Sequence, residues 1–287
     1  MYCVLYNPKA GSGKGESVND KLKAILKDEE IIFKNVLEID DYPKLISEIG
    51  IEAKLVLVGG DGSLNHFANN ISNLELKNKV YFYAAGTGND FLNDIGLEAS
   101  GGPYEINKYL KNLPSVEVNG NKSLFINNVG FGIDGYCCEV ADQIHEAEPE
   151  KEVNYSSIAI KGLLGKFKPR NAKITVDGKE YNYKKVWLAP TMNGRFYGGG
   201  MNCAPSQDRL NKKRTLSVVV LHCGSKLRTL MVFPSIFKGE HIKHKNMVSI
   251  VEGSDITVEF DKPCALQIDG ETVLNVTKYR ATSSKIK

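Results

Sequence analysis

Glycine-rich loops that directly follow short apolar runs constrain this chain more than any other feature. Residues 2–6, 55–58 and 80–84 are apolar runs of strand length, and glycine-rich segments follow each of them. A further apolar run covers residues 31–36, and helical patterns lie between the runs. Alternation of buried strand, loop and helix is typical of a parallel sheet with right-handed crossovers. The N-terminal part is therefore predicted to be an α/β domain with a parallel, Rossmann-like sheet.

The second part of the chain shows strand patterns instead. Asn119-Gly120 and Asp177-Gly178 separate pairs of strand-like runs, 116–118 from 124–129 and 173–176 from 180–183, and such dipeptides form β-hairpin turns. One helical stretch is expected at about residues 136–164. We predict an α/β domain over residues 1–118 and a β-rich domain, built as a sandwich, over residues 119–287. A return of the C-terminal tail to the first domain is left open.

Composition excludes several classes of protein. Apolar residues make up 42% and charged residues 25% of the chain, which is typical of a globular protein. The net charge of +3 is too small to predict a nucleic-acid partner. None of the six cysteines forms a CxxC pair, so we expect reduced thiols and no zinc site. No apolar run reaches the roughly 18 residues of a membrane span, which favours a cytoplasmic protein with transient, peripheral membrane contact.

The first glycine-rich loop, residues 7–15, has the composition of a phosphate-binding loop. Glycine lets the backbone approach a ligand closely, and the helix expected after the loop offers unpaired N–H groups. Lys14 adds a positive charge. Pro8 and Gly15 depart from a Walker A loop, and Glu16 departs from a dinucleotide-binding fingerprint. The alternative is a flexible turn.

Two further loops end strands of the same predicted sheet. Asp61 lies among three glycines, and the segment after residues 80–84 contains Thr87, Asn89 and Asp90. Ligands of open α/β sheets bind at the carboxyl ends of the strands, where a carboxylate can hold a magnesium–phosphate unit. Alternatively, Asp61 caps the helix that follows a simple turn. Because three such loops would meet at one edge of the sheet, the sequence predicts a nucleotide site there.

Residues 130–135 also match GxGxxG, but no strand ending in an acid follows at the distance that a dinucleotide fold requires. We interpret this segment as one that brings Asp134 to a cleft between the domains. Further on, Asp269 follows the strand predicted at residues 264–268. Since alternate residues of a strand face opposite sides, we expect Asp269 to face away from the core that Leu266 and Ile268 enter. The alternative for Asp269 is a simple turn.

Six segments, in order, resemble the catalytic domain of diacylglycerol kinases, the family that includes bacterial lipid kinases and sphingosine kinases. They read NPKAGSGK, GGDGSLN, GTGNDF, NNVGFGIDG, GGGMNCAP and IDGE, and they extend from Asn7 to about Glu271. The resemblance implies an NAD-kinase-like α/β domain followed by a β-rich domain, with ATP in the cleft. It also implies an ATP-dependent kinase that uses Mg²⁺ and acts on a lipid hydroxyl, with diacylglycerol as the leading acceptor and phosphatidic acid as the product.

The resemblance also assigns roles to individual residues. Nucleotide-phosphate contacts would come from Asn7, Gly11, Ser12, Gly13, Lys14, Gly60, Gly62, Ser63, Gly86, Thr87 and Asn89. Asp61, Asp90 and Asp134 would surround the catalytic magnesium. Asp269 and Glu271 match the DGE motif, in which the Asp is the proposed general base. Asp61 would be catalytic as well, because it would support magnesium–ATP.

The sequence departs from this family at two places. Ala84-Ala85 stand where the family usually has a proline, and Asn211-Lys212 stand where an Asp-Gly usually follows GGGMNCAP. In some bacterial members that Asp holds a structural magnesium. We therefore do not expect this second metal here; the alternative is that Asp208, at a shifted position, takes the place of the missing Asp.

Two alternatives to a lipid kinase remain open. One is a soluble-substrate kinase of the NAD kinase type, which the ordered GTGNDF and IDGE segments disfavour. The other is a non-catalytic ATP-binding regulatory protein, which Asp61, Asp90 and Asp269 disfavour. The sequence does not settle the lipid or the oligomeric state, for which a homodimer is one option. Candidate segments for membrane contact are residues 161–170, 196–201 and 238–245.

Overall fold

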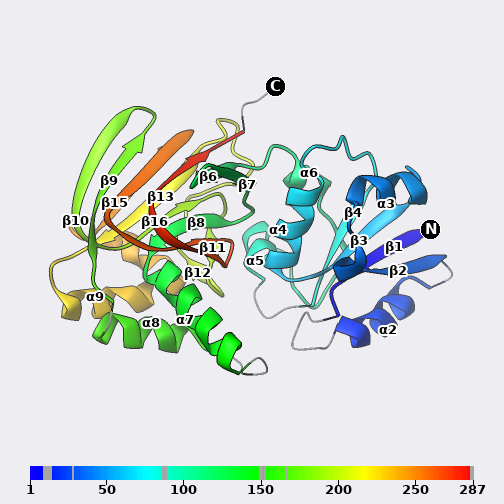
Figure 1. Cartoon of the computed structure of the whole chain (residues 1–287), viewed down its shortest axis with the longest axis horizontal. Coiled ribbons are helices and arrows are strands. Elements are labelled where there is room, and N and C mark those ends of the chain that lie inside the picture. Colours follow the sequence, from blue (N-terminus) through cyan, green and yellow to red (C-terminus); the bar gives the residue numbers. More distant parts are fainter. Residues whose placement is uncertain are drawn as a thin grey trace. The chain divides into compact units, whose positions relative to one another are not determined.

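The computed structural model describes residues 1–8, 15–27, 29–85, 89–148, 151, 153–165 and 167–284. The chain divides into two compact units, Met1–Lys111 and Asn112–Lys287. Each unit is described by itself below (Figure 1). The boundary predicted at residue 118 stays a prediction, although the strand that ends there pairs within the second unit.

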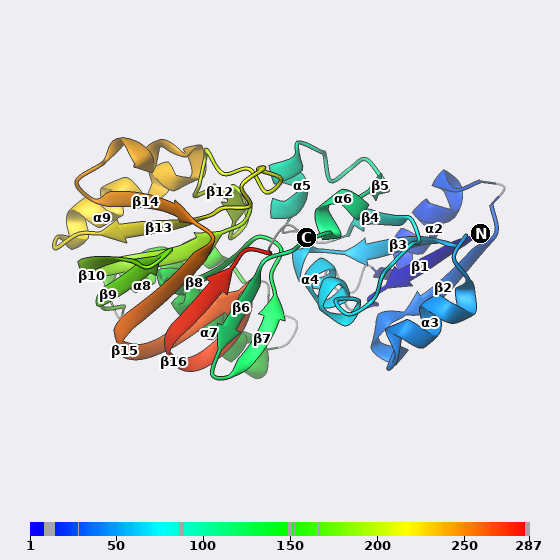
Figure 2. The ribbon, with the colours of Figure 1, turned by 90° about the horizontal axis from the view of Figure 1, so that it is seen from above.

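The first unit alternates strands and helices along the chain. Its elements are β1 (Tyr2–Tyr6), α2 (Gly15–Ile25), β2 (Ile31–Asn35), η1 (Val36–Glu38), α3 (Tyr42–Ile49), β3 (Lys54–Gly59), α4 (Asp61–Asn70), β4 (Val80–Ala84), α5 (Asp90–Ile95), β5 (Tyr104–Glu105) and α6 (Asn107–Leu110). The strand order is β2-β1-β3-β4-β5, parallel except for β5 at the edge (Figure 2). The predicted parallel α/β domain is therefore confirmed, with one antiparallel strand added.

Helices cover both faces of this sheet. Residues 55–58 of the central strand β3 are all buried, as expected for a strand between two helical layers. On one face, Leu22 of α2 packs in a cluster with Val56. On the other, Phe67 of α4 and Tyr42 of α3 meet edge to face. Because β1, β2, β3 and β4 are parallel, their carboxyl ends lie at one edge of this covered sheet.

The second unit is mostly antiparallel strand. Its elements are β6 (Ser115–Val118), β7 (Asn121–Leu124), β8 (Asn128–Gly132), α7 (Ile133–Ala147), α8 (Tyr155–Leu164), β9 (Arg170–Val176), β10 (Lys179–Met192), β11 (Phe196–Tyr197), β12 (Met201–Asn202), β13 (Leu216–His222), α9 (Lys226–Val232), η2 (Phe233–Lys238), η3 (Glu240–Lys243), β14 (Val248–Gly253), β15 (Asp255–Ile268) and β16 (Glu271–Thr282). A nine-stranded sheet has the order β14-β13-β10-β8-β15-β16-β6-β7, and β9 pairs with both β10 and β15.

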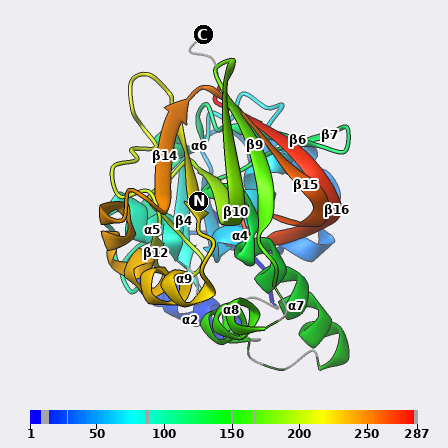
Figure 3. The same cartoon turned by 90° about the vertical axis from the view of Figure 1, so that its left-hand side faces the viewer.

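Two apolar cores lie on this sheet. Side chains from β6, β8, β9, β10, β13, β15 and β16 converge on one core that includes Phe131 and Tyr279, so the sheet encloses a core as a sandwich does. A second core, which includes Trp187, lies between the sheet and the helices α7, α8 and α9 (Figure 3). The predicted β-rich second domain is confirmed.

The predicted helical stretch at residues 136–164 is wrong as a single helix. The structure has two helices there, because Asn154 starts a new one. Its side chain accepts a hydrogen bond from the N–H of Ser157 at 2.8 Å and caps α8. The sequence predicted the helical stretch but not the break within it.

Three hairpin turns share one backbone conformation. Asn119-Gly120 and Asp177-Gly178 have φ of 50° and 78°, and of 47° and 83°, as the primed two-residue turns require. Asp269-Gly270, with φ of 47° and 96°, joins β15 to β16 in the same way. The predicted partner strand at residues 124–129 is wrong, because β7 ends at Leu124 and the next strand, β8, pairs with β10 and β15.

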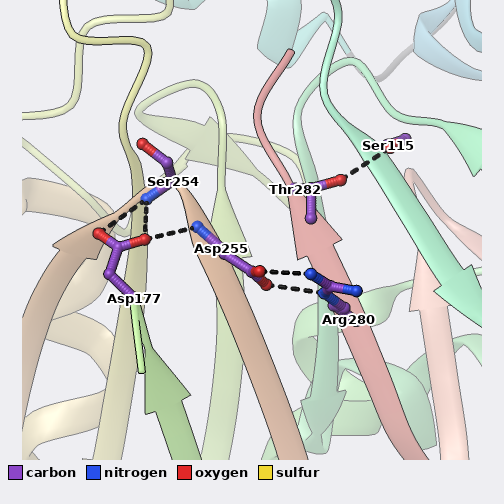
Figure 4. A network of polar contacts seen from close by, with 6 residues as sticks. All are labelled: Ser115, Asp177, Ser254, Asp255, Arg280 and Thr282. Carbon is purple, nitrogen blue, oxygen red and sulfur yellow. Dashed lines mark hydrogen bonds and ion pairs between the residues drawn. The ribbon is translucent and has the colours of Figure 1, made fainter. Parts of the chain in front are cut away.

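A polar network ties the strand ends of the nine-stranded sheet together (Figure 4). The Asp177 carboxylate accepts hydrogen bonds from the N–H groups of Ser254 and Asp255, both at 2.9 Å. Arg280 donates from two nitrogens to the carboxylate of Asp255 and holds the pKa of that carboxyl below its usual value. A hydroxyl pair also joins β16 to β6. The turn between β9 and β10 is thus fixed to the start of β15.

Candidate active site

Three strand ends of the first unit lie at one edge of the parallel sheet. β1, β3 and β4 are adjacent and parallel, and Asn7, Gly60 and Ala85 follow them along the chain. The geometry therefore places the starting points of the three glycine-rich loops on the same side, at the carboxyl ends of the strands. Six of the predicted phosphate-contacting residues lie outside the described residues: Gly11, Ser12, Gly13, Lys14, Gly86 and Thr87.

Asp61 joins the second loop to the third. Its Oδ2 accepts a hydrogen bond from the N–H of Asp90 at 2.9 Å, and its Oδ1 accepts one from the N–H of Phe91 at 3.2 Å. These N–H groups belong to the first turn of α5, so the carboxylate satisfies donors that a helix leaves unpaired. The alternative that Asp61 caps its own helix is wrong, because Gly60 occupies that position in α4.

A close contact explains one glycine of the second loop. A Cβ on Gly59 would lie 2.2 Å from the Ser63 Oγ, so only glycine fits beneath this hydroxyl. Gly62 is exposed and Ser63 is partly buried, while the Asp90 side chain is buried. Asp61 and Asp90 are therefore brought together in the first unit, through the main chain of Asp90.

Asp134 of the second unit is a buried carboxyl group. It lies in the first turn of α7, and burial raises its pKa to about 7, against the opposing effect of hydrogen bonds from backbone N–H groups and Gln267. Gln267 Nε2 donates to its Oδ2 over a long 3.5 Å. Within the described part of the chain, Oδ1 has no hydrogen-bond partner. A buried oxygen of this kind fits a proton, a water molecule or a cation.

The glycines around Asp134 have a packing explanation. A Cβ on Gly130 would lie 2.7 Å from both the Pro190 Cα and the Asp134 Oδ2, and one on Gly135 would lie 2.2 Å from the Ala265 carbonyl oxygen. Glycine therefore lets β8 lie against β10, and α7 against β15. That the segment brings Asp134 to a cleft stays a prediction.

Asp269 is the first residue of the turn between β15 and β16. Its carboxylate accepts hydrogen bonds from three consecutive backbone N–H groups, of Ile126 at 2.5 Å, Asn127 at 2.8 Å and Asn128 at 2.9 Å. The expectation that its side chain follows the alternation of the strand is wrong, because φ of 47° takes the residue out of extended backbone. Asp269 does lie in a turn, as the alternative expected, and its catalytic role stays a prediction.

Gln267 links two of the predicted site residues and was not selected in the sequence analysis. The side chain is buried, donates to Asp134, and accepts a hydrogen bond from the N–H of Gly270 at 2.9 Å. Alternation along the strand places Gln267 on the face opposite to that of Leu266. An amide on that face, two residues before Asp269, was the signal in the sequence that could have identified it. Glu271 is exposed at the start of β16.

The structure thus forms two groups of site residues, one in each unit. Asp61 with Asp90 forms the first, and Asp134, Gln267 and Asp269 form the second. That the two groups meet stays a prediction. Over the described residues, no cluster of three or more His, Cys, Asp or Glu side chains is placed to hold a metal ion.

The loop after β12 is closed by an amide. Asn211 donates to the carbonyl oxygens of Asp208 at 2.7 Å and Thr215 at 2.9 Å, and it accepts from the N–H of Thr215 at 2.9 Å. Asp208 Oδ1 accepts from the N–H of Leu210 at 2.9 Å. Asn211 therefore makes hydrogen bonds at the position where the family's Asp was expected.

Comparison with known protein families agrees with both units. Residues 1–116 match the diacylglycerol kinase catalytic domain, and residues 127–282 match the YegS C-terminal NAD kinase beta sandwich-like domain. The chain therefore belongs to the family of diacylglycerol kinase-type kinases that combine these two domains. The resemblance drawn from the six sequence segments is confirmed.

Similar proteins carry related names. "Putative lipid kinase YtlR" of Bacillus subtilis (strain 168) is 25% identical over 89% of this chain and 82% of that protein. "Diacylglycerol kinase" of Mycobacterium tuberculosis (strain ATCC 25618 / H37Rv) is 25% identical over 73% of this chain and 67% of that protein. A crystal structure described as "a putative diacylglycerol kinase from Bacillus anthracis str. Sterne" has a TM-score of 0.70 at 22% identity, covering 99% of this chain and 92% of that chain. At this identity, the similarity to the solved structure shows the fold alone.

Proposed function

We propose that this protein transfers the γ-phosphoryl group of ATP to the hydroxyl of a membrane lipid, with diacylglycerol as the acceptor and phosphatidic acid as the product. The family implies ATP as the phosphoryl donor. The observation that supports the lipid acceptor most is the match to both domains, in a chain whose similar proteins are named as lipid or diacylglycerol kinases. The lipid lies in a membrane, so the proposal includes peripheral membrane contact.

In this proposal the first unit holds the nucleotide. Asn7, Gly60, Gly62, Ser63 and Asn89 would contact the phosphates, together with the six loop residues outside the described part of the chain. Asp61 keeps the start of α5 beside the second loop, so its first task is to position these loops. Phosphoryl transfer depends mainly on such positioning and on charge neutralisation.

Magnesium fits part of this site. Asp61 and Asp90 lie together in the first unit, and the unpartnered Oδ1 of Asp134 is an oxygen of the type that Mg²⁺ prefers. These three carboxylates would hold the ion, which would neutralise charge on the phosphates. Gly130 and Gln267 would keep the Asp134 carboxyl in place.

In the second unit, Asp269 would accept the proton of the lipid hydroxyl, with Glu271 beside it in the chain. Three backbone N–H groups donate to its carboxylate, and such donors favour the ionised form, which is the form that accepts a hydroxyl proton. They also make the carboxylate a weak base. A loose phosphoryl-transfer transition state needs little base strength, so orientation of the hydroxyl would be the larger contribution.

The acceptor is tested with labelled ATP and purified protein. The panel contains vesicles of diacylglycerol, sphingoid base, ceramide or phosphatidylglycerol, and NAD without lipid. We expect label on diacylglycerol. Label on NAD alone would establish the NAD kinase type. This alternative is included because the second domain matches an NAD kinase beta sandwich-like domain. ATP binding without label on any acceptor would indicate a regulatory protein.

The role of Asp269 can be tested against a matched residue. Asp177 also begins an Asp-Gly hairpin turn, and its carboxylate also accepts backbone N–H groups. Asp269→Asn and Asp177→Asn should both lower the free energy of unfolding, by about 1–3 kcal/mol for the partly buried N–H groups around Asp269 and by less for the exposed ones around Asp177. Only Asp269→Asn should also reduce turnover, by about 10²–10⁴, with ATP binding kept. Equal losses of turnover in both variants would show that Asp269 has a structural role and not a catalytic one.

A further inference from the structure

Helix α8 presents an apolar face to solvent. Ile160 and Leu164, one turn apart, are 46% and 62% exposed. The face that packs into the core beneath the helix is also apolar and includes Ala159 and Leu163. A helix at a water interface normally carries polar residues on its outer face. The outer face of α8 is therefore built for contact with something less polar than water.

Helix α9 repeats this arrangement. Leu227 and Met231, again one turn apart, are 68% and 65% exposed, while Val232 is buried in the same core as α8. Both helices thus bury one side in a common core and turn an apolar side outward. The following turn η2 adds Phe237, which is also exposed.

The two outer faces are neighbours. Lys226 Nζ, at the start of α9, donates to the carbonyl oxygen of Gly165, just after the end of α8, at 3.4 Å. Figures 1 and 3 both show α8 between α7 and α9. We call the surface formed by Ile160, Leu164, Leu227 and Met231 the α8–α9 surface.

The segments that form the α8–α9 surface are rich in positively charged residues. Residues 155–170 and 225–245 together contain nine Lys and Arg and one acid, Glu240. The Glu240 carboxylate pairs with Lys243 at 2.7 Å, which lowers its pKa. The exposed cations Lys161 and Arg228 lie on the two helices themselves. The exposed acids of α7 belong to a helix on the far side of α8 from α9 (Figure 3).

This combination of charges identifies one occupant. A second copy of the chain seated on the same surface by a twofold axis would oppose lysines to lysines, which is unfavourable. An anionic bilayer suits both components, because the apolar side chains can enter the acyl boundary while Lys and Arg extend toward lipid phosphates. We propose that the α8–α9 surface docks this protein on bilayers that contain anionic phospholipid. This inference deepens the proposed function, since the lipid acceptor would come from that bilayer, but docking itself requires no catalysis.

Vesicle sedimentation tests the docking surface with the full chain and no ATP. The vesicles are phosphatidylcholine alone, or phosphatidylcholine mixed with phosphatidylglycerol. We expect binding to the mixed vesicles, weakened by salt. The double variant Leu227→Ser/Met231→Ser should lose about tenfold or more of this binding, and Lys161→Gln/Arg228→Gln should lose its salt-sensitive part.

The matched control is Leu274→Ser, which removes a leucine of β16 that is 54% exposed and lies outside the α8–α9 surface. It should bind vesicles as the wild type does, and all variants should keep the wild-type circular dichroism and melting temperature. Unchanged binding by the Leu227/Met231 variant, or an equal loss in the control, would overturn the proposal. A wild-type dimer that this variant converts to monomer, with no effect on vesicles, would assign the surface to self-association instead.

Activity separates this inference from the proposed kinase. On a short-chain diacylglycerol dissolved as monomers, the Leu227/Met231 variant should turn over as fast as the wild type, and on vesicles it should be slower. A wild type that binds vesicles through this surface but labels no lipid would remove the lipid kinase and leave the docking surface. If the wild type labels lipids and the Leu227/Met231 variant binds vesicles and reacts normally on them, the docking surface is removed and the lipid kinase is left.

Discussion

At the scale of single residues, Asp134 is the side chain whose environment departs most from that of an ordinary carboxyl group. Burial raises its pKa to about 7, and its one side-chain donor, Gln267, is 3.5 Å away. Near neutral pH the group therefore changes between the neutral and the charged form. A proton and a cation would compete for the same carboxyl group.

The pKa of Asp134 predicts how stability depends on pH in metal-free protein. The unfolded chain releases this proton near the ordinary value of 3.8, and the folded chain releases it at about 7. Between these values the folded state binds the extra proton, so the free energy of unfolding falls as pH rises, by a few kcal/mol in order of magnitude. Asp134→Asn cannot titrate and should lack this slope. Urea unfolding in EDTA at about pH 5 and about pH 8 measures it, and the variant should gain on the wild type toward the higher pH.

Asp142→Asn is the control for this prediction, because Asp142 is exposed on the same helix. It should follow the wild type at both pH values. If the difference in unfolding free energy between Asp134→Asn and the wild type is the same at both pH values, burial does not raise the pKa of Asp134. Magnesium added at the higher pH should stabilise the wild type and not Asp134→Asn, since a ligand that binds only the folded state stabilises it.

At the scale of secondary-structure elements, apolar runs and turn dipeptides predicted most of the fold. Strand β4 covers the predicted residues 80–84, and two Asn-Gly or Asp-Gly turns form where expected. One error has a local cause, and the other has a tertiary cause. Asn154 caps a new helix inside an apolar periodicity, and Asp269 leaves its strand because the N–H groups of residues 126–128 bind its carboxylate.

The candidate site could be predicted in part, because some of its features are local in the sequence. The glycine-rich loops and the carboxylates of Asp61, Asp90 and Asp134 are such local features. The partner of Asp61 could not be predicted, because it is the main chain of another loop, 29 residues further on. Gln267 was also missed, since its role depends on Asp134, which is distant in the chain.

Helix α5 gives a prediction at this scale. It has six residues, and Asp61 satisfies two of its first N–H groups. Asp61→Ala should cost about 1–2 kcal/mol of unfolding free energy and should weaken ATP binding, because the third loop loses its attachment to the second. Chemical unfolding and ATP titration by calorimetry measure the two effects.

The control for Asp61 is Asp41→Ala, which removes the cap of α3 in the same unit, where Asp41 accepts from the N–H of Lys44 at 2.9 Å. Its stability should fall by a similar amount with ATP binding unchanged. Should both variants lose ATP binding equally, Asp61 would act through the general stability of the unit.

At the scale of the whole molecule, each unit contains a core of its own. The cluster around α2 uses residues of the first unit, and the two clusters on the nine-stranded sheet use residues of the second. Each unit therefore meets the usual condition for a domain that folds alone. Separately, among the described residues, no helix is long and apolar enough to cross a membrane.

Truncation tests this condition and the position of the boundary together. Residues 112–287 keep strand β6, which pairs with β16 through Val116 and Ala281, whereas residues 119–287, the domain predicted from the sequence, lack β6. The longer fragment should unfold cooperatively on heating with the circular dichroism of a β-rich protein. The shorter one should melt lower, because the loss of β6 exposes the edge of β16 and the buried side chain of Ala281. Equal melting temperatures would support the boundary at residue 118, and a broad transition with dye binding in both fragments would show that the second unit needs the first.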